Sequence, residues 1–201
     1  MRNTMLRNAL IATVLLLMPF YVQSQIPKVE PASKMILPTG PKNDIKITLL
    51  SLGSGSTRIT YERATAPRQS AELTVGIIGL GFDIMNHADP GGILLKAAYK
   101  WNLAPMMSAN STLAGFYVKP ELVYANYGYC HEGIAGHTSQ TALLGECGYQ
   151  LIVRWFVFDI YAGVGPTFGT GNADNYYHSF MRFPADGFMA FTSGFRIGYA
   201  F

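Results

Sequence analysis

Residues Met189–Phe201 read MAFTSGFRIGYAF, in which large apolar side chains alternate with small or polar ones. Successive side chains of a β-strand point to opposite faces, so this period of two predicts a strand with one apolar face. The apolar face carries Met189, Phe191, Phe195, Ile197, Tyr199 and Phe201, with Ser193 as the exception. The other face carries Ala190, Thr192, Gly194, Arg196, Gly198 and Ala200.

The same alternation recurs upstream and predicts about eight strands in all. It is clear in Ile93–Leu103, Phe116–Ala125 and Phe156–Gly165. Four further segments fit less regularly: Ile45–Leu52, Ser56–Arg63, Ser70–Asp83 and Gln140–Val153. The sequence therefore predicts an all-β fold, a closed antiparallel up-and-down transmembrane β-barrel of about eight strands.

The expected connections support this topology. Gly53-Ser54-Gly55 and Ala66-Pro67-Arg68 are turn sequences that lie where strands should reverse. Three connections are expected to be long: Asn86–Gly92, Tyr127–Ser139 and Phe168–Asp186. Short turns on one side and long loops on the other are typical of an outer-membrane barrel with both termini inside.

The chain begins like an exported protein. Arg2 and Arg7 precede the apolar run Ala9–Phe20 (ALIATVLLLMPF), and Val22-Gln23-Ser24 offers tolerated residues at a cleavage site. This order is typical of a secretory signal peptide, so we expect cleavage before Gln25. The run is shorter than the about 20 apolar residues that a membrane-spanning helix needs.

The rest of the chain is expected to form two parts. Residues 1–24 are the signal peptide, and residues 25–43 carry Pro27, Pro31, Pro38 and Pro41, which indicates an extended periplasmic linker. Residues 44–201 have the length of one domain and are expected to be the outer-membrane barrel.

The composition gives no support for a nucleic-acid partner. Fifteen Lys and Arg residues face twelve Asp and Glu residues, and Arg2 and Arg7 leave with the expected signal peptide. The mature chain is thus close to neutral and has no basic cluster. Cys130 and Cys147 leave a disulfide and two free thiols equally open, and two cysteines without a CxxC pair do not specify a metal site.

Alternation alone does not say which face points outward, because a soluble lipocalin-type barrel alternates with its apolar face lining a cavity. The chain ends at Phe201 on its own strand, with Tyr199 on the same face, which resembles the terminal signal for insertion into the outer membrane. Aromatic residues also lie toward strand ends, as an interfacial girdle requires: Tyr99, Trp101, Tyr124 and Phe156.

Charge on the opposite faces favours the same orientation. These faces carry five basic and five acidic residues, Arg58, Lys96, Lys100, Lys119 and Arg196 against Glu62, Glu72, Glu121, Glu146 and Asp159. Equal numbers suit a sealed polar interior, because buried charges persist only when they are paired. We therefore predict an interior polar network of these ten residues in a lumen that side chains fill.

Four segments carry the strand patterns most fully: Ile47–Tyr61 (ITLLSLGSGSTRITY), Gly115–Tyr127 (GFYVKPELVYANY), Gly148–Phe168 (GYQLIVRWFVFDIYAGVGPTF) and Gly194–Phe201 (GFRIGYAF). They resemble a group of small bacterial outer-membrane barrels of uncharacterised function, with an OmpA/OmpX-type architecture. The resemblance covers nearly all of the mature domain, and its motifs are specific to fold and not to chemistry. It implies an outer-membrane location and a monomeric barrel, with no inherited active site.

His137-Thr138-Ser139 places an imidazole and a hydroxyl on one face of a strand or loop end. Lipid A 3-O-deacylase barrels similarly use an H-x-S pair with a Glu, because the imidazole takes the Ser proton and the carboxylate fixes its tautomer. Glu146 is the nearest downstream carboxylate, but its opposite strand parity directs it away from the pair. Polar residues of an external loop are the favoured interpretation.

Three other patterns receive structural interpretations. Cys130-His131-Glu132, with His137 nearby, matches no usual zinc spacing. The glycines of Val75–Gly81 (VGIIGLG) lie in a strand pattern without a following helix, so they are expected to ease curvature or close packing rather than bind a nucleotide. Four tyrosines of expected loops are candidates for contact with an external partner or the membrane interface: Tyr127, Tyr129, Tyr176 and Tyr177.

The function expected from the sequence is a structural or surface-interaction role in the bacterial outer membrane. The expected partners are outer-membrane lipid and an external ligand or protein at the loops; no catalytic, cofactor or metal site is predicted. Two alternatives stay open. One is a lipid A-modifying hydrolase that uses His137 and Ser139, and the other is a soluble periplasmic barrel that binds an apolar ligand inside.

Overall fold

The computed structural model describes residues 40–83, 90–105, 111–131, 134–170, 181–182 and 188–201. Their strands form one sheet with a single short helix between the first two. The elements are β1 (Asn43–Thr48), α2 (Leu49–Gly53), β2 (Ser54–Ala66), β3 (Gln69–Asp83), β4 (Gly91–Pro105), β5 (Gly115–His131), β6 (Ile134–Val153), β7 (Phe156–Thr170), β8 (Met181–Arg182) and β9 (Met189–Ala200). None of the helices in these segments has the length and apolarity to cross a membrane.

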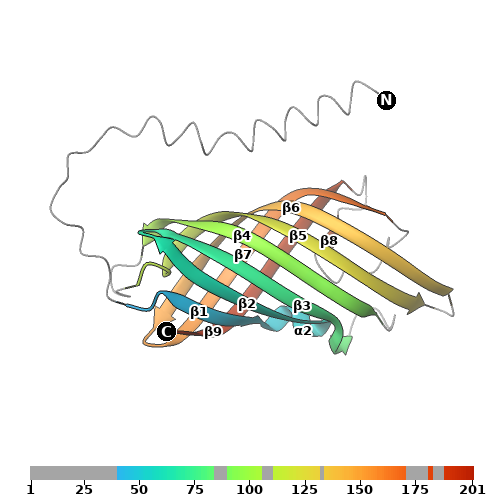
Figure 1. The fold of residues 1–201 in the computed structure, drawn as a ribbon, viewed down its shortest axis with the longest axis horizontal. Helices are drawn as coiled ribbons and strands as arrows, with labels where there is room; N and C mark the ends of the chain where they lie inside the picture. The colour runs from blue at the N-terminus through green and yellow to red at the C-terminus, as the bar shows by residue number, and fades with distance from the viewer. Residues whose placement is uncertain (1–39, 84–89, 106–110, 132–133, 171–180, 183–187) are drawn as a thin grey trace, which may run out of the picture. The chain divides into compact units, whose positions relative to one another are not determined.

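The sheet closes on itself (Figure 1). Leaving aside the two-residue β8, eight strands pair antiparallel in chain order, and β1 pairs with β9 to complete the ring. The predicted all-β, closed, up-and-down barrel of eight strands is confirmed.

The first and last strands meet at one end of the barrel, which we call the terminal end. Here the backbone N–H groups of Lys42 and Asn43 donate to Phe201 O at 3.2 and 3.0 Å. Tight turns join β2 to β3 and β6 to β7 at this end, with Arg68 and Arg154 at positive φ. The opposite end, where β5 meets β6, is called the hairpin end.

The β5–β6 hairpin extends beyond its neighbours. Its two strands pair without interruption as far as His131 and Ile134, whereas β4 follows β5 only to Gly128 and β7 follows β6 only to Ser139. The prediction of a long loop at Tyr127–Ser139 is therefore wrong. Outward side chains turn polar in this part of the hairpin, so the apolar alternation on which the prediction depended is missing there.

The other two expected loops are described only at their edges. β4 begins at Gly91, and β7 continues to Thr170. Residues 84–89, 171–180 and 183–187 lie outside the described residues.

The wall between β9 and β2 is built differently from the rest. β1 pairs with β9 only from Asp44 to Thr48, and the single turn of α2 then continues the chain. Serine hydroxyls satisfy carbonyls of this turn: Ser51 Oγ donates to Thr48 O at 2.8 Å, and Ser54 Oγ donates to Ser51 O at 3.0 Å. One turn of helix can follow a strand here because its polar backbone groups find local partners.

The glycine-rich segment Val75–Gly81 lies in β3 and packs against α2. Gly79 has a φ of +94°, which favours glycine, and a Cβ on Gly81 would come within 2.8 Å of Leu52 O. The pairing of β2 with β3 shifts register nearby, after Ser54. These glycines therefore allow β3 to bend and approach α2 closely.

Outward and inward faces differ in polarity. Most large side chains on the outside are apolar and about half exposed, including Ile59, Leu73, Val75, Ile77, Ile93, Leu122, Ile160 and Val164. The inward face is layered. A charged layer occupies the middle, with an apolar cluster at the terminal end (Leu113, Ala114, Ile152, Val157 and Ala200) and another toward the hairpin end (Ile78, Leu94, Val123, Ala125, Tyr127, Ala142, Leu144 and Ala190).

Tyrosines lie against glycines on neighbouring strands at three places. Tyr117 pairs with Gly148, Tyr161 with Gly194, and Tyr129 with Gly136. A Cβ on any of these three glycines would collide with the opposite tyrosine ring. The absence of a side chain on one strand thus makes room for the ring of the next, a device that fixes register.

Candidate functional site

The charged layer contains six basic and six acidic buried residues: Lys46, Arg58, Lys96, Lys100, Lys119 and Arg196 with Asp44, Glu62, Glu72, Glu121, Glu146 and Asp159. The structure places all ten residues of the expected network on the inward face. Asp44 and Lys46 of β1 were missed by the sequence reasoning. Asp44 precedes the expected strand Ile45–Leu52, and the alternation of that segment stops at Thr48, just before α2, so its pattern is short.

Glu72 of β3 is the centre of the layer. Its carboxylate contacts Lys46 Nζ at 2.9 Å, Arg196 Nη1 at 3.3 Å and Lys100 Nζ at 3.9 Å, and it also pairs with Lys119. These four cations come from β1, β4, β5 and β9. One carboxylate therefore links strands around most of the ring.

Lys46 holds β1 to the layer. Its Nζ lies 2.5 Å from Glu62 Oε2 and 3.5 Å from Asp159 Oδ2, in addition to its contact with Glu72. It also donates to Gln150 Oε1 at 3.0 Å. The shortest barrel strand thus reaches β2, β3, β6 and β7 through one side chain.

Neutral groups complete the layer. Gln150 Oε1 also accepts from Lys100 Nζ at 2.7 Å, and its Nε2 donates to Asp44 Oδ2 at 2.8 Å. Tyr117 OH donates to Asp159 Oδ1 at 2.7 Å. Lys100 lies 4.4 Å from the Tyr117 ring centroid, which adds a cation–π contact.

This arrangement suits a structural role. The layer holds six basic and six acidic side chains, with an apolar cluster on either side of it. Ion pairs join eleven of them, and Arg58 Nε donates to Ser56 Oγ at 3.2 Å. Burial of unpaired charge costs several kcal/mol, so the contacts are a requirement for closing this interior.

The H-x-S pair lies on the outside of the barrel. His137 Nε2 pairs with Asn126 Oδ1 at 3.0 Å, and Ser139 Oγ donates to Tyr124 OH at 3.5 Å. Asn126 Nδ2 also donates to Tyr124 OH at 3.5 Å, so these four residues form what we call the outward polar cluster. Glu146 is buried in the lumen and is not brought to the pair.

Other singled-out residues do not form a site. Cys130 and Cys147 are free and exposed, and the β5–β6 register separates them by about 40 Å of strand, since Cys130 pairs with Ala135 and Cys147 with Val118. Among the described residues no group of His, Cys, Asp or Glu is placed to hold a metal ion. Glu132 lies outside those residues.

The four tyrosines of the expected loops have different positions. Tyr127 is buried in the cluster toward the hairpin end, and Tyr129 is partly buried against it, so an external role for Tyr127 is wrong. Both belong to the extended β5–β6 hairpin, and their parity points them into the lumen. Tyr176 and Tyr177 lie outside the described residues.

Exposed charges gather at the terminal end. Among charged residues with described side chains, those not in the charged layer are Lys42, Arg63, Arg68 and Arg154. All four lie at or beside the turns and chain ends of that end. The described part of the outer wall between the terminal end and the hairpin end therefore carries no charged side chain.

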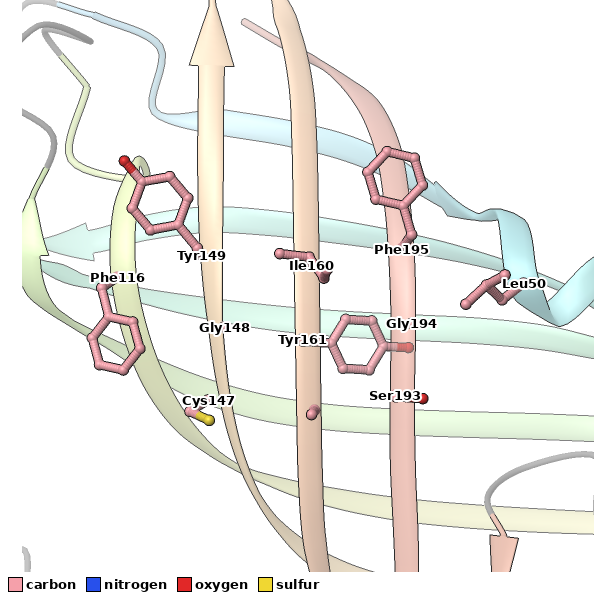
Figure 2. Close-up of a pocket in the computed structure, with 11 residues that line it drawn as sticks. Leu50, Phe116, Cys147, Gly148, Tyr149, Ile160, Tyr161, Ser193, Gly194 and Phe195 are labelled. Atoms are coloured by element: carbon pink, nitrogen blue, oxygen red, sulfur yellow. The ribbon is translucent and has the colours of Figure 1, made fainter.

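The outer wall has a shallow apolar hollow over β6, β7 and β9, with a volume of about 510 Å³ (Figure 2). Its floor is a row of small outward residues that oppose one another across three strands, Cys147, Ala162 and Ser193. Larger side chains border this row: Phe116, Tyr149, Ile160, Phe195 and, from α2, Leu50. We call this feature the outer hollow.

Comparison with known proteins gives no match to a protein-family model, to a curated protein or to a solved structure. The function is therefore argued from the arrangement of these residues.

Proposed function

We propose that this protein is a bacterial outer-membrane β-barrel with a structural or surface-interaction role. The observation that carries the proposal is the distribution of polarity. Twelve ionisable side chains are buried in the lumen, while large apolar side chains cover the outside. A protein in water gains by the opposite arrangement, whereas lipid tails favour an apolar wall.

The height of the apolar wall supports the proposal. Outward residues of β7 are apolar from Phe156 to Phe168. That length is about 40 Å of strand, or about 30 Å along the membrane normal at a tilt of about 40°. The hydrocarbon core of a bilayer is about 30 Å thick, so the wall matches it.

Aromatic rings at the terminal end resemble an interfacial girdle. Trp155 stacks on Tyr199 with ring centroids 6.2 Å apart, and Tyr199 stacks on Phe201 at 6.4 Å. Tyr99 and Trp101 form an edge-on pair at 5.0 Å on another part of the wall. Tyr199 and Phe201, the expected insertion signal, thus belong to a continuous aromatic surface.

The exposed cations suggest the orientation. Lys42, Arg63, Arg68 and Arg154 surround the terminal end, next to the girdle. Basic residues there would face lipid phosphates of the inner leaflet, which favours an orientation with the terminal end of the barrel on the periplasmic side and the β5–β6 hairpin on the outer side. The expected signal peptide would deliver the chain to that side.

A soluble barrel for an apolar ligand needs an apolar lumen. Here the middle of the lumen holds the charged layer, and Glu72 and Lys46 lie at its centre. The hydrolase alternative needs a carboxylate on His137, which instead pairs with Asn126. Neither alternative receives support from these contacts.

Fractionation of expressing cells tests the proposal. We expect the mature protein in the outer membrane, with a folded species that migrates differently from the boiled one in SDS gels. Release into the soluble periplasmic fraction without such a shift would overturn the proposal.

A charged substitution on the outer wall tests whether that wall faces lipid. Val75 is 50% exposed on β3. Val75→Lys should lower the free energy of unfolding of the barrel in vesicles by about 2–4 kcal/mol, because the ammonium would lie in lipid. Val75→Leu is the matched control and should fold normally. Equal stability of the Lys and Leu variants would mean that the wall faces water.

A further inference from the structure

We propose that the outer wall binds one glycolipid of the surrounding membrane, with its sugar headgroup on the outward polar cluster and an acyl chain in the outer hollow. The inference rests on the proposed membrane location and names a partner for the surface-interaction role. Its two parts lie on the same strands, because β5 and β6 carry the cluster and β6 also lines the hollow.

The cluster has the chemistry of a sugar-binding surface. Tyr124, Asn126, His137 and Ser139 offer hydroxyl, amide and imidazole groups, which both donate and accept hydrogen bonds. All four are uncharged or weakly basic. Sugar hydroxyls need this mixture of donors and acceptors, whereas phosphate groups are preferentially bound by Arg and Lys.

The charge distribution agrees with a neutral headgroup. Among residues with described side chains, the exposed cations lie at the terminal end, at the far side of the wall from the cluster. A phospholipid headgroup at the cluster would therefore meet no lysine or arginine in the described wall. The neutral polar groups and the apolar surface beneath them are complementary to an amphiphile that carries no net charge.

The cluster lies where the wall changes from apolar to polar. On β5 the outward residue changes from Leu122 to Tyr124 and then Asn126, and on β6 it changes from Leu143 to Ser139. Tyrosine at such a boundary is typical of the membrane interface. A headgroup bound at the cluster would thus be at its natural depth.

The spacing between cluster and hollow fits one lipid. From Ser139 to Cys147 the strand β6 runs about 27 Å, or about 20 Å along the normal at a tilt of about 40°. One leaflet of hydrocarbon is about 15 Å thick, so the hollow lies near the middle of the bilayer, and an acyl chain that reaches it from the cluster follows the tilted strand β6 rather than the membrane normal. On β6 the outward residues between the two sites are Thr141, Leu143 and Gly145, so a chain on this path packs against Leu143 and over the missing side chain of Gly145.

The hollow offers an acyl chain closer packing than a flat stretch of wall would. Cys147, Ala162 and Ser193 form the floor. The larger side chains of Tyr149, Ile160 and Phe195 border it (Figure 2). Lipid tails already surround the wall, so the gain on binding comes from close van der Waals contact rather than from leaving water. A shallow recess with a small-residue floor and larger bordering side chains increases that contact.

Native mass spectrometry tests the inference. The folded barrel in detergent micelles is incubated with equal amounts of monoglucosyl diacylglycerol and phosphatidylglycerol of the same acyl chains. We expect one glucolipid to be retained about 10-fold more than the phospholipid. Ala162→Phe, which fills the hollow, and the double variant Asn126→Ala with His137→Ala should each reduce this retention about 10-fold.

Ile77→Phe is the matched control, because Ile77 is an outward residue of β3, opposite β7 in the ring. It should retain the glucolipid like the parent protein. Equal retention of both lipids, preferential retention of phosphatidylglycerol, or an equal loss in all three variants would overturn the inference. The heat-dependent gel shift is recorded for every sample, so a failure to form the membrane barrel is distinguished from a folded barrel that lacks a lipid site.

Discussion

Between β5 and β6 seventeen residue pairs run from Gly115 to His131, whereas β1 pairs with β9 through only five. The hairpin is local in sequence and rich in backbone hydrogen bonds. The β1–β9 pairing, which we call the seam, joins the first and last strands of the barrel. After Thr48 the chain continues as α2 instead of more strand. The barrel therefore depends on backbone pairing in the β5–β6 hairpin, whereas the seam needs side-chain contacts in addition.

Buried ion pairs stabilise the seam, where few backbone hydrogen bonds are available. Asp44 and Lys46 of β1 enter the charged layer, and Lys46 alone contacts Glu62, Glu72 and Asp159. The hairpin instead has Tyr117 over Gly148 and Tyr129 over Gly136. The comparison teaches that the buried charges close the ring, while tyrosine–glycine contacts set the register of strands that already pair.

The largest expected effect is at the seam. Lys46→Met should lower the free energy of unfolding by about 3–5 kcal/mol, because its carboxylate partners stay buried without their central cation. Urea unfolding in vesicles, followed by tryptophan fluorescence and gel shift, measures the change. Ile47→Met, on the outward face of the same strand, should cost less than about 1.5 kcal/mol. Similar losses in the two variants would show that the charged layer does not hold β1.

A smaller effect is expected in the hairpin. Gly148→Ala places a methyl group against the Tyr117 ring and within 2.6 Å of Ile160 O on the neighbouring strand, and it should cost about 1–3 kcal/mol through overpacking. Gly145→Ala on the same strand has open space, with Val164 O 3.8 Å from the added Cβ, and should be close to neutral. The same urea titration compares them. A neutral Gly148→Ala would mean that the tyrosine and the β7 backbone can both move aside at no cost.

The smallest effect is a difference in local opening. Amides of Ile45–Ile47 should exchange with deuterium about 10-fold faster than those of Val118–Leu122, a difference of about 1.4 kcal/mol. The short seam opens at a smaller free-energy cost than the long hairpin. Mass spectrometry of the protein in nanodiscs measures both peptides at once. Slower exchange at β1 would reverse the proposed ranking of the two regions.

Much of the barrel was predictable because its alternation is strict where each strand crosses the apolar wall. Phe156–Gly165 and Ile93–Leu103 are examples, and parity alone directed Lys96, Asp159 and Glu146 inward. Parity in the sequence also separates Glu146 from His137 and Ser139. A period of two contains this information because each residue has only two possible faces.

Prediction failed where that rule no longer applies. β1 is six residues long and stops at α2, so Asp44 and Lys46 had too short a pattern to be recognised. Beyond the apolar wall, Asn126 and His137 on the outward face and Thr138 on the inward face are all polar, so the hairpin resembled a loop. Tyr127 points into the lumen only because that strand continues. The outer hollow depends on Cys147, Ala162 and Ser193 being opposite one another, which is a matter of register between strands.

The position of Glu72 has a consequence for how such a sequence can diverge. Its carboxylate is shared by cations from four other strands. A charge reversal at this position could not be compensated by one second substitution, because each lysine or arginine also serves a different acid. Interior positions of this barrel should therefore change in coordinated groups or remain as they are, while the outer wall is free to exchange one apolar residue for another. Among related chains, correlated variation between β1, β3, β4, β5 and β9 would be the record of that constraint.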